Sequence, residues 1–334
     1  MPLDLLVPDL LAPPDAPAAM RDLRLPGLEK WLARADLERS EEAGATRWLA
    51  RRFALPSPPP VAAVALAGEG DRAEGAWMRA DPVHLRIDGD ALVLHDAAVL
   101  GLTREEAEPL VAALQSLFDE DRLRFRAPSP ERWYVEVPEV ELPTTVPLEE
   151  ARGRDPFGLL PTGSGRINWR SAITEAQMVL AAHDVNARRE AAGAPLVNSV
   201  WFWGEGPTPA SVDRPYAAVH AREAFARGLA ALSGAAAPPV PKSVAELAAP
   251  GTASAVLVVL DELAAPWSRV DAAGWRAAAE GLDRAWFRDL GEAIERFGTV
   301  RIVLPRATDT LVAVLSGRAR RRWLRRSRPL ATHG

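Results

Sequence analysis

The sequence predicts an α/β protein whose mainly parallel sheet has helices on both faces, and three observations lead to this fold class. Short apolar runs typical of strands alternate with amphipathic helical stretches over residues 168–315. The run at 255–260, AVLVVL, is apolar throughout, as in a strand that is buried on both faces. The stretch 177–209 contains a helix end, a break at Gly193 and Pro195, a short apolar strand and a glycine-rich exit, which together make half of an α/β unit.

The N-terminal part of the chain predicts one strand and two helices. Apolar residues favour a strand at 3–7, and amphipathic periodicity favours helices at 18–37 and 46–55. The proline-rich segment 56–60 ends the second helix and is typical of a stiff linker.

The pattern of the sequence changes after this linker and predicts a small α+β module. Alternating residues on both sides of a turn at 88–90 are the clearest hairpin signal in the chain. Thr103 and Glu106 have the spacing of a capping box, which predicts a helix that runs to Phe118. Further strands are expected at 61–67, 76–78, 123–126 and 133–137.

The rest of the chain returns to the α/β pattern. Helices are expected at 168–192, 222–232 and 271–297, and strands at 197–203, 255–260, 299–304 and 310–315. We therefore expect an α/β core formed by residues 1–58 and 140–334, interrupted by an inserted α+β module at 60–138.

Composition and charge restrict the classes of protein to which the chain can belong. Its formal net charge of −5 gives no general attraction to nucleic acid or to an anionic membrane. No stretch approaches the roughly 18 apolar residues that a membrane span requires. The N-terminus has acids and prolines where a signal peptide has a basic start, and the chain contains no cysteine. These features predict a cytoplasmic protein without membrane contact, disulfides or thiolate catalysis.

Polar side chains at the two ends of the predicted strand VNSVWFW are candidates for a ligand site. His183, Asn186 and Arg189 recur at helical spacing, and such donors can hold a phosphate or a carboxylate. Asn198 and Glu205 flank the strand, and ligands of open parallel sheets bind beyond the carboxyl ends of the strands.

A structural role is the alternative for the same residues. From spacing alone, His183 is better explained as a satisfied core histidine than as a ligand group. Gly204 and Gly206 allow either a ligand or another stretch of backbone to approach closely.

Acidic residues that follow two late strands are weak candidates for metal ligands. Asp261 and Glu262 end the strand at 255–260, and Asp309 follows the strand at 299–304. Such carboxylates can hold a divalent cation, but they can equally be charges at a helix N-terminus. None of the five histidines lies beside them, and the chain has no HExxH, GxGxxG or GxxxxGK[ST] motif.

The C-terminal segment 318–328 contains seven arginines and could bind RNA, DNA or another anionic surface. Because the rest of the chain is acidic, we favour a helix with a solvated face, in which Trp323 and Leu324 pack on the core.

Two motifs resemble those of a known enzyme family. The stretch 183–206, with HDVNARR followed by NSVWFWGEG, resembles the motif of archaeal-type cofactor-independent phosphoglycerate mutases. The module 76–137 is similar to the domain that interrupts the alkaline-phosphatase-like core of that family. With RADPVHLR at 79–86 and the arginine-rich C-terminus, the chain is more similar still to RpfE-type regulatory proteins. The resemblance implies an α/β core of the alkaline phosphatase superfamily.

The chain departs from this family at the catalytic centre. The mutases use a phosphorylated serine and two divalent metals, which are held by an N-terminal Asp-Gly segment and by late motifs that contain histidine. Here the first strand ends in VPDL, no histidine follows Asp261 or Asp309, and the nucleophile region offers only Thr46, a weak candidate.

These departures predict a non-catalytic regulatory or metabolite-binding protein that resembles a mutase without its metal centre. No cofactor is expected. The expected partners are a phosphorylated or carboxylated small metabolite and a protein partner, whereas nucleic acid is not expected. The alternatives are an active metal-dependent phosphomutase or phosphatase with a reorganised site, and a nucleic-acid-associated regulator that acts through the C-terminal arginines.

Overall fold

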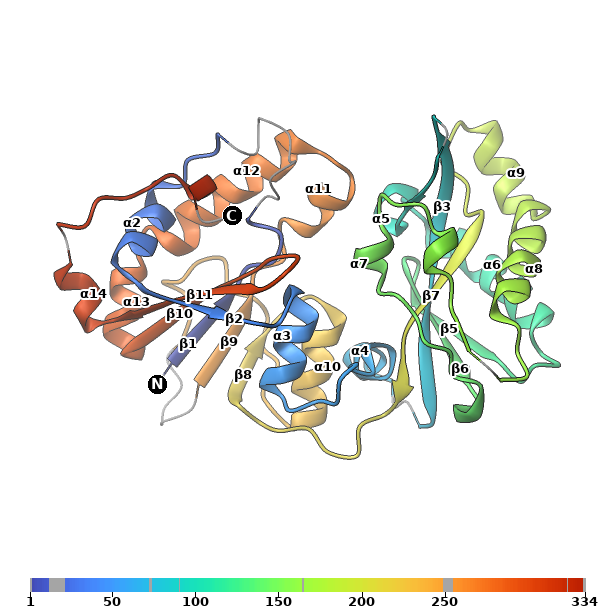
Figure 1. The fold of residues 1–334 in the computed structure, drawn as a ribbon, viewed down its shortest axis with the longest axis horizontal. Coiled ribbons are helices and arrows are strands. Elements are labelled where there is room, and N and C mark those ends of the chain that lie inside the picture. The colour runs from blue at the N-terminus through green and yellow to red at the C-terminus, as the bar shows by residue number, and fades with distance from the viewer. Residues whose placement is uncertain are drawn as a thin grey trace. The chain divides into compact units, whose positions relative to one another are not determined.

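The chain divides into two compact units, which are described separately below. The computed structural model describes residues 2–11, 22–71, 74–89, 91–163, 165–248, 255–322 and 324–332 (Figure 1). Unit 1 comprises Met1–Leu55 and Ser211–Gly334, and unit 2 comprises Pro56–Ala210. Unit 2 therefore lies, in the sequence, between the two segments of unit 1. The boundary at 210 corrects the expected boundary at 138, because residues 140–210 belong to unit 2 and not to the core.

Unit 1 contains a six-stranded mixed sheet with the order β2-β11-β10-β1-β9-β8. β1 is parallel to β10 and β9, and β9 is parallel to β8, whereas β10–β11 and β11–β2 are antiparallel pairs. The strands are β1 (Pro2–Leu6), β2 (Asp36–Ser40), β8 (Tyr216–His220), β9 (Ala255–Val259), β10 (Thr299–Pro305) and β11 (Thr310–Ser316). The four mutually parallel strands end at the same edge of the sheet, which we call the carboxyl edge.

Helices lie on both faces of this sheet, with α2, α12 and α13 on one face and α3 and α10 on the other (Figure 1). The helices are α2 (Pro26–Arg34), α3 (Gly44–Arg52), α10 (Ala224–Ser233), α11 (Ala264–Ser268), α12 (Ala272–Leu282), α13 (Leu290–Phe297) and α14 (Gly317–Arg321). A π-helical turn, Asp283–Phe287, joins α12 to α13. Apolar residues at alternate positions of β1, such as Leu3 and Leu5, pack with Trp275 and Trp286 in one buried cluster.

Unit 2 contains a five-stranded antiparallel sheet in which β3 pairs with β4, β6 and β7, and β6 also pairs with β5. The strands are β3 (Ala76–Asp88), β4 (Ala91–His95), β5 (Arg124–Ser129), β6 (Arg132–Val137) and β7 (Ser199–Pro207). The helices are α4 (Val61–Gly68), α5 (Ala97–Leu100), α6 (Arg104–Leu117), α7 (Leu148–Ala151), α8 (Trp169–Ala181) and α9 (Asp184–Ala191). Residues of α6, α8 and α9 share a buried cluster with one face of the sheet.

Several elements of unit 2 confirm the sequence-based expectations. The hairpin pairs His84 with His95 and Leu85 with Leu94 across the expected turn. The Thr103 hydroxyl accepts from the backbone N–H of Glu106, and the Glu106 carboxylate accepts from the N–H of Thr103, which completes the capping box.

Residues 61–67, which were expected to form a strand, form helix α4 instead. The segment VAAVALAG has no alternation, and it is rich in alanine, the residue with the highest helix propensity. Pro60 precedes the first turn, and all but one of the helix residues are buried. A short apolar run does not distinguish a buried strand from a buried helix, and here packing decided for the helix.

Two other helices end earlier than the periodicity predicts. The expected helix at 168–192 is broken between α8 and α9, because His183 is extended and caps the second helix. Of the expected helix at 18–37, residues 18–21 lie outside the described residues, and the rest contains α2, which begins only at Pro26 and ends at Arg34. Asp36 already begins strand β2, which pairs with β11. None of the described helices combines the length and the apolar character that a membrane span requires.

Candidate functional sites on strand β7 and at the carboxyl edge

Asn186 and Arg189, two of the predicted ligand residues, are buried and bonded to backbone. The Asn186 amide donates to the carbonyls of Leu180 and Val197, both at 2.8 Å, and accepts from the N–H of Val197 at 2.9 Å. Arg189 donates to the carbonyls of Pro195, at 2.8 Å, and Leu100. These bonds fasten α9 to the start of β7, as buried polar groups generally require.

Arg189 also makes an ion pair that connects two helices. Its guanidinium lies 2.7 Å from the carboxylate of Glu106, which is the capping-box residue of α6. The side chain of Arg189 is 5% exposed, so its donors face protein rather than an open site. An incoming phosphate would have to displace both the carboxylate and the carbonyls.

His183 and Asn198 have comparable structural roles. The His183 ring accepts from the N–H of Val185 at 3.1 Å and so caps α9, which corrects the expectation that it lies on the buried face of one long helix. The Asn198 amide accepts from the N–H of Leu85 at 2.7 Å and donates to its carbonyl at 2.8 Å. These two bonds from the Asn198 side chain to the backbone of Leu85 continue the contact between β3 and β7 just before the first residue of β7.

Glu205 and the two glycines connect β7 to neighbouring backbone. The Glu205 carboxylate accepts from the N–H of Thr145 at 3.1 Å and from its hydroxyl. A Cβ at Gly204 would lie 3.0 Å from Cβ of Val61, and one at Gly206 would lie 2.6 Å from Cβ of Pro60. The two glycines could allow close approach of either a ligand or another protein segment. In the structure, the start of α4 lies against them.

The predicted pocket at the carboxyl end of a parallel sheet is wrong in its location. β7 pairs antiparallel with β3 in unit 2 and does not belong to the parallel sheet of unit 1. Asn198 and Glu205 lie at opposite ends of β7, and seven strand residues span roughly 23 Å. Asn186 and Arg189 lie on α9 and His183 caps this helix, whereas Glu205 bonds to Thr145 instead.

The carboxyl edge of unit 1 carries the predicted metal-ligand candidates, and arginine pairs with each of them. After β9, the Asp261 carboxylate lies 2.7 Å and the Glu262 carboxylate 2.6 Å from the same guanidinium nitrogen of Arg222. Arg222 follows the neighbouring strand β8. One guanidinium thus bridges the two acids. Desolvation by burial acts to lower the pKa of Arg222, but the hydrogen bonds and negative charges of Glu262 and Asp261 together outweigh it and raise this pKa.

Asp309 makes a similar pair at the end of β10. Nε of Arg306 lies 2.5 Å from its carboxylate, a second nitrogen of Arg306 also bonds to it, and Arg39 lies 3.4 Å away. The hydrogen bond from Arg306 and its positive charge lower the pKa of Asp309, against a smaller effect of burial. β1 lies between β9 and β10, so the two acidic groups are separated by two strand spacings, about 10 Å.

Thr46 lies in the first turn of α3, next to the second of these groups. The N–H of Gly44, at the start of α3, donates to the carbonyl of Arg306 at 3.0 Å. Thr46 is half-buried, and among the described residues no His, Asp or Glu side chain bonds to its hydroxyl. No group of three or more His, Cys, Asp or Glu side chains suited to a metal ion occurs within the ranges described for Figure 1.

Sequence reasoning missed the arginines of the carboxyl edge. Arg222 and Arg306 each follow a strand closely, and this position is a signal that could have identified them as partners of the acids. A buried network was also missed: Asp4, in the middle of β1, is fully buried and pairs with Arg301 at 2.6 and 2.9 Å. The Tyr216 hydroxyl donates to Asp4 at 2.6 Å, and burial followed by the Asp4 charge raises the pKa of Tyr216.

The C-terminal arginines are partly engaged with unit 1. α14 ends at Arg321, so the expected helix over 318–328 is wrong, and Leu324 is 77% exposed rather than packed on the core. Trp323 lies outside the described residues. Arg320 pairs with Glu295, and Arg322 lies 2.5 Å from Asp36, which shows that the segment contacts unit 1 through charges.

Comparisons with known proteins bear on the fold. No protein-family model matches the chain, and no curated protein matches it in sequence. The PH0037 protein from Pyrococcus horikoshii is similar in structure, with a TM-score of 0.55 and 15% identity over 99% of this chain and 92% of that one. At this identity the likeness shows a common fold and nothing about activity.

A second similar structure has a known description. The cofactor-independent phosphoglycerate mutase from Thermoplasma acidophilum DSM 1728 gives a TM-score of 0.44 and 18% identity, over 95% of this chain and 90% of that one. A TM-score below 0.5 does not by itself establish a common fold.

Proposed function

We propose that this chain is a non-catalytic regulatory or metabolite-binding protein, built on a scaffold like that of the cofactor-independent phosphoglycerate mutases. The observation that carries the proposal is the pairing of every candidate metal ligand with arginine. Arg222 bridges Asp261 and Glu262, and Arg306 holds Asp309. The mutase-like scaffold is inferred from the motif resemblance at 183–206.

The pairing matters because phosphoryl transfer depends on charge neutralisation. Two-metal sites hold the attacking and leaving oxygens with cations about 4 Å apart, and carboxylates hold those cations. A carboxylate already bonded to a guanidinium offers fewer free lone pairs, and the guanidinium repels an incoming cation. The two acidic groups also end strands that are not adjacent, with β1 between them. This arrangement favours neutralisation of the acidic residues at the carboxyl edge by arginines of the protein and not by metal ions.

A hydroxyl nucleophile would need activation that the neighbourhood of Thr46 does not provide. A weak nucleophile requires a base within hydrogen-bond reach or a coordinated metal. Arg306, which lies at the same strand end, is a cation and cannot accept the proton. Fixed donors are nevertheless sufficient to bind an anion, so loss of catalysis is compatible with binding of a phosphorylated or carboxylated metabolite.

The test compares metal binding and turnover in matched variants. Calorimetric titration with Mn²⁺ should give no saturable binding to the native protein. The variant Arg222→Gln should gain Mn²⁺ binding, since it frees Asp261 and Glu262, whereas Arg227→Gln, which changes an exposed arginine on α10, should not. Conversion of 3-phosphoglycerate to 2-phosphoglycerate and hydrolysis of a generic phosphomonoester should stay at background with Mn²⁺ or Mg²⁺.

The opposite result would identify an enzyme. Metal-dependent turnover by the native protein that disappears in Asp261→Asn or Asp309→Asn would refute the proposal. It would show that metal ions displace the arginines from these carboxylates in solution.

A further inference from the structure

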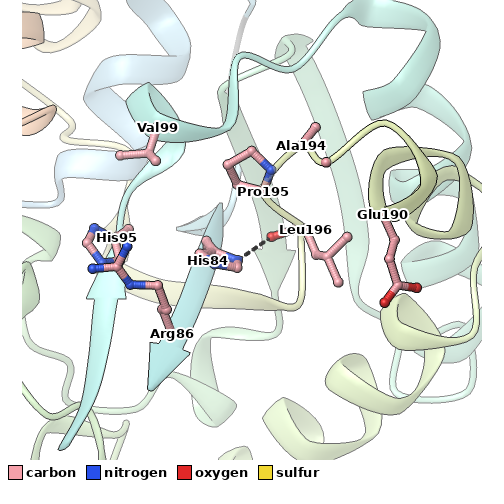
Figure 2. Close-up of a pocket in the computed structure, with 9 residues that line it drawn as sticks. His84, Arg86, His95, Val99, Glu190, Ala194, Pro195 and Leu196 are labelled. Atoms are coloured by element: carbon pink, nitrogen blue, oxygen red, sulfur yellow. Dashed lines mark hydrogen bonds between the residues drawn. The ribbon is translucent and has the colours of Figure 1, made fainter. Parts of the chain in front are cut away.

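A pocket of about 430 Å³ lies between the β3–β4 hairpin and the segment that joins α9 to β7 (Figure 2). This volume is within the range of small-molecule sites. His84 and His95 are direct partners across the hairpin, and their ring centroids are 6.3 Å apart. Arg86, two residues after His84 on the same strand, lines the same pocket, since alternate residues of a strand share a face.

One hydrogen bond determines how the His84 ring can act. Its Nδ1 lies 2.9 Å from the carbonyl of Leu196 (Figure 2). A carbonyl only accepts, so Nδ1 carries the hydrogen, and Nε2 is the ring atom whose protonation can change. The ring is thereby held in one orientation on the pocket wall. Nε2, which this bond leaves available, can share a proton with a phosphate oxygen without any movement of the ring.

The nitrogen-bearing side chains of the pocket and its carboxylate lie on different sides. The two imidazoles and the Arg86 guanidinium lie on the hairpin side, and Glu190 lies beyond Leu196 (Figure 2). Val99, Pro195 and Leu196 provide apolar surface. Two facing imidazoles can also bind a divalent cation, but the guanidinium on the same strand face cannot ligate a cation, whereas its five N–H donors suit the oxygens of a phosphate.

We propose that this pocket binds the phosphate group of a small hydroxylated phosphomonoester, with His84, Arg86 and His95 as donors to the phosphate. Glu190 accepts a hydrogen bond from a hydroxyl group at the other end of the ligand. The inference rests on the proposed metabolite-binding function and gives that function a site, which lies entirely in unit 2 and is lined by none of the predicted ligand residues.

Glycerol 3-phosphate is a suitable probe, with glycerol as the uncharged comparison. Calorimetric titration of the full-length protein should show binding of glycerol 3-phosphate and none of glycerol. Arg86→Gln should weaken this binding at least about tenfold, the effect of losing one charge-assisted contact of about 1.4 kcal/mol. Arg124→Gln, an exposed change on β5 of the same unit, is the matched control and should bind as the native protein does.

A second measurement localises the ligand without a variant that could fail to fold. The ring nitrogen signals of His84 and His95 in NMR spectra should shift during the titration, and those of His220 in unit 1 should not. Absence of binding, or binding of native strength in both Arg86→Gln and His84→Gln, would overturn the proposal. Zn²⁺ binding that is lost in His84→Gln, without phosphate binding, would also overturn it and assign a cation site.

These outcomes are separate from those of the turnover assay. If the turnover assay gives background rates and glycerol 3-phosphate binds without involving His84 or Arg86, the metabolite-binding function stands and this pocket is the wrong site. If the protein turns over substrate with metal, the non-catalytic function fails whatever the pocket binds.

Discussion

The carboxyl edge of unit 1 and the stretch 183–206 of unit 2 use polar residues in different ways. At the edge, Asp261 and Glu262 pair with the half-exposed Arg222 from the neighbouring strand end, and Asp309 pairs with Arg306, three residues before it. In the stretch 183–206, Asn186, Arg189, Asn198 and Glu205 bond mainly to backbone. A pair of side chains at an edge can exchange partners at little cost, whereas a buried side chain bonded to backbone leaves unsatisfied groups when it moves. A change of ligand is therefore easier at an edge or in an open pocket than within this stretch.

In both units a buried carboxylate of the sheet pairs with an arginine, next to an aromatic donor. In unit 1 the pair is Asp4 with Arg301, and Tyr216 donates to Asp4. In unit 2 it is Arg79 with Asp81 at 2.6 Å, and the Trp203 indole donates to Asp81 at 2.8 Å. The following predictions test the contrast between exchangeable and fixed polar groups.

Loss of the Asp4 charge should have the largest effect. Asp4→Asn leaves Arg301 without its counter-charge in the sheet, so the free energy of unfolding should fall by about 3–5 kcal/mol. Urea denaturation followed by tryptophan fluorescence measures it. Glu280→Gln, which changes an exposed i,i+4 pair on α12, should lower stability by less than about 1 kcal/mol. If both changes lower the free energy of unfolding equally, the burial of Asp4 does not determine its contribution to stability.

Gly206→Ala should destabilise unit 2 by about 2–4 kcal/mol, because the added methyl group meets Pro60 and the backbone has a φ of 149°. Gly193→Ala is the matched control, since its φ is 67° but no atom lies within 4 Å of the new Cβ. It should cost about 1 kcal/mol from backbone strain alone. Thermal unfolding distinguishes the two. A smaller loss at Gly206 than at Gly193 would show that α4 does not pack closely on β7.

Two adjacent arginines of α9 test whether the predicted ligand residues are structural. Arg189→Gln should lower stability by about 2–3 kcal/mol, because it breaks charge-assisted bonds to Glu106 and to buried carbonyls. Arg188→Gln, at an exposed position, should change stability by less than about 0.5 kcal/mol. Hydrogen exchange of the 183–199 amides should accelerate in the first variant and not in the second. If the exchange rates in Arg189→Gln equal those of the native protein, a ligand-binding role of Arg189 would be supported instead.

The smallest expected effect is the pH dependence of the Asp309 pair. The pKa of Asp309 is below its ordinary value of 3.8 because of the bond to Arg306. The pair therefore stabilises the fold above that ordinary value, and the contribution is lost as pH falls through the lower folded-state pKa. Because both side chains keep partial contact with solvent, the contribution should amount to about 1 kcal/mol or less. Arg306→Gln should show a shallower loss of stability below pH 4 than the native protein, and an equally steep loss would contradict this assignment.

The sequence alone determined those elements whose signals are local. The capping box of Thr103 and Glu106 needs contacts within one helical turn, and the hairpin that pairs His84 with His95 needs neighbouring strands and a short turn. The run at 255–260 is apolar on both sides, and β9 is indeed buried between β1 and β8. In each case the physical cause lies in residues that are close together in the chain.

Tertiary structure decided which sheet each element joined and which partner each polar group found. The 183–206 stretch has a helix–strand pattern that fits a parallel sheet, but its strand pairs with β3 in an antiparallel one, because pairing is a long-range choice. Segment 61–67 became a helix whose start packs against Gly204 and Gly206 of β7, and Asp261 met Arg222 from the end of a neighbouring strand. The periodicity of apolar residues indicates which face of a helix or strand is buried. Which other element covers that face depends on contacts throughout the chain.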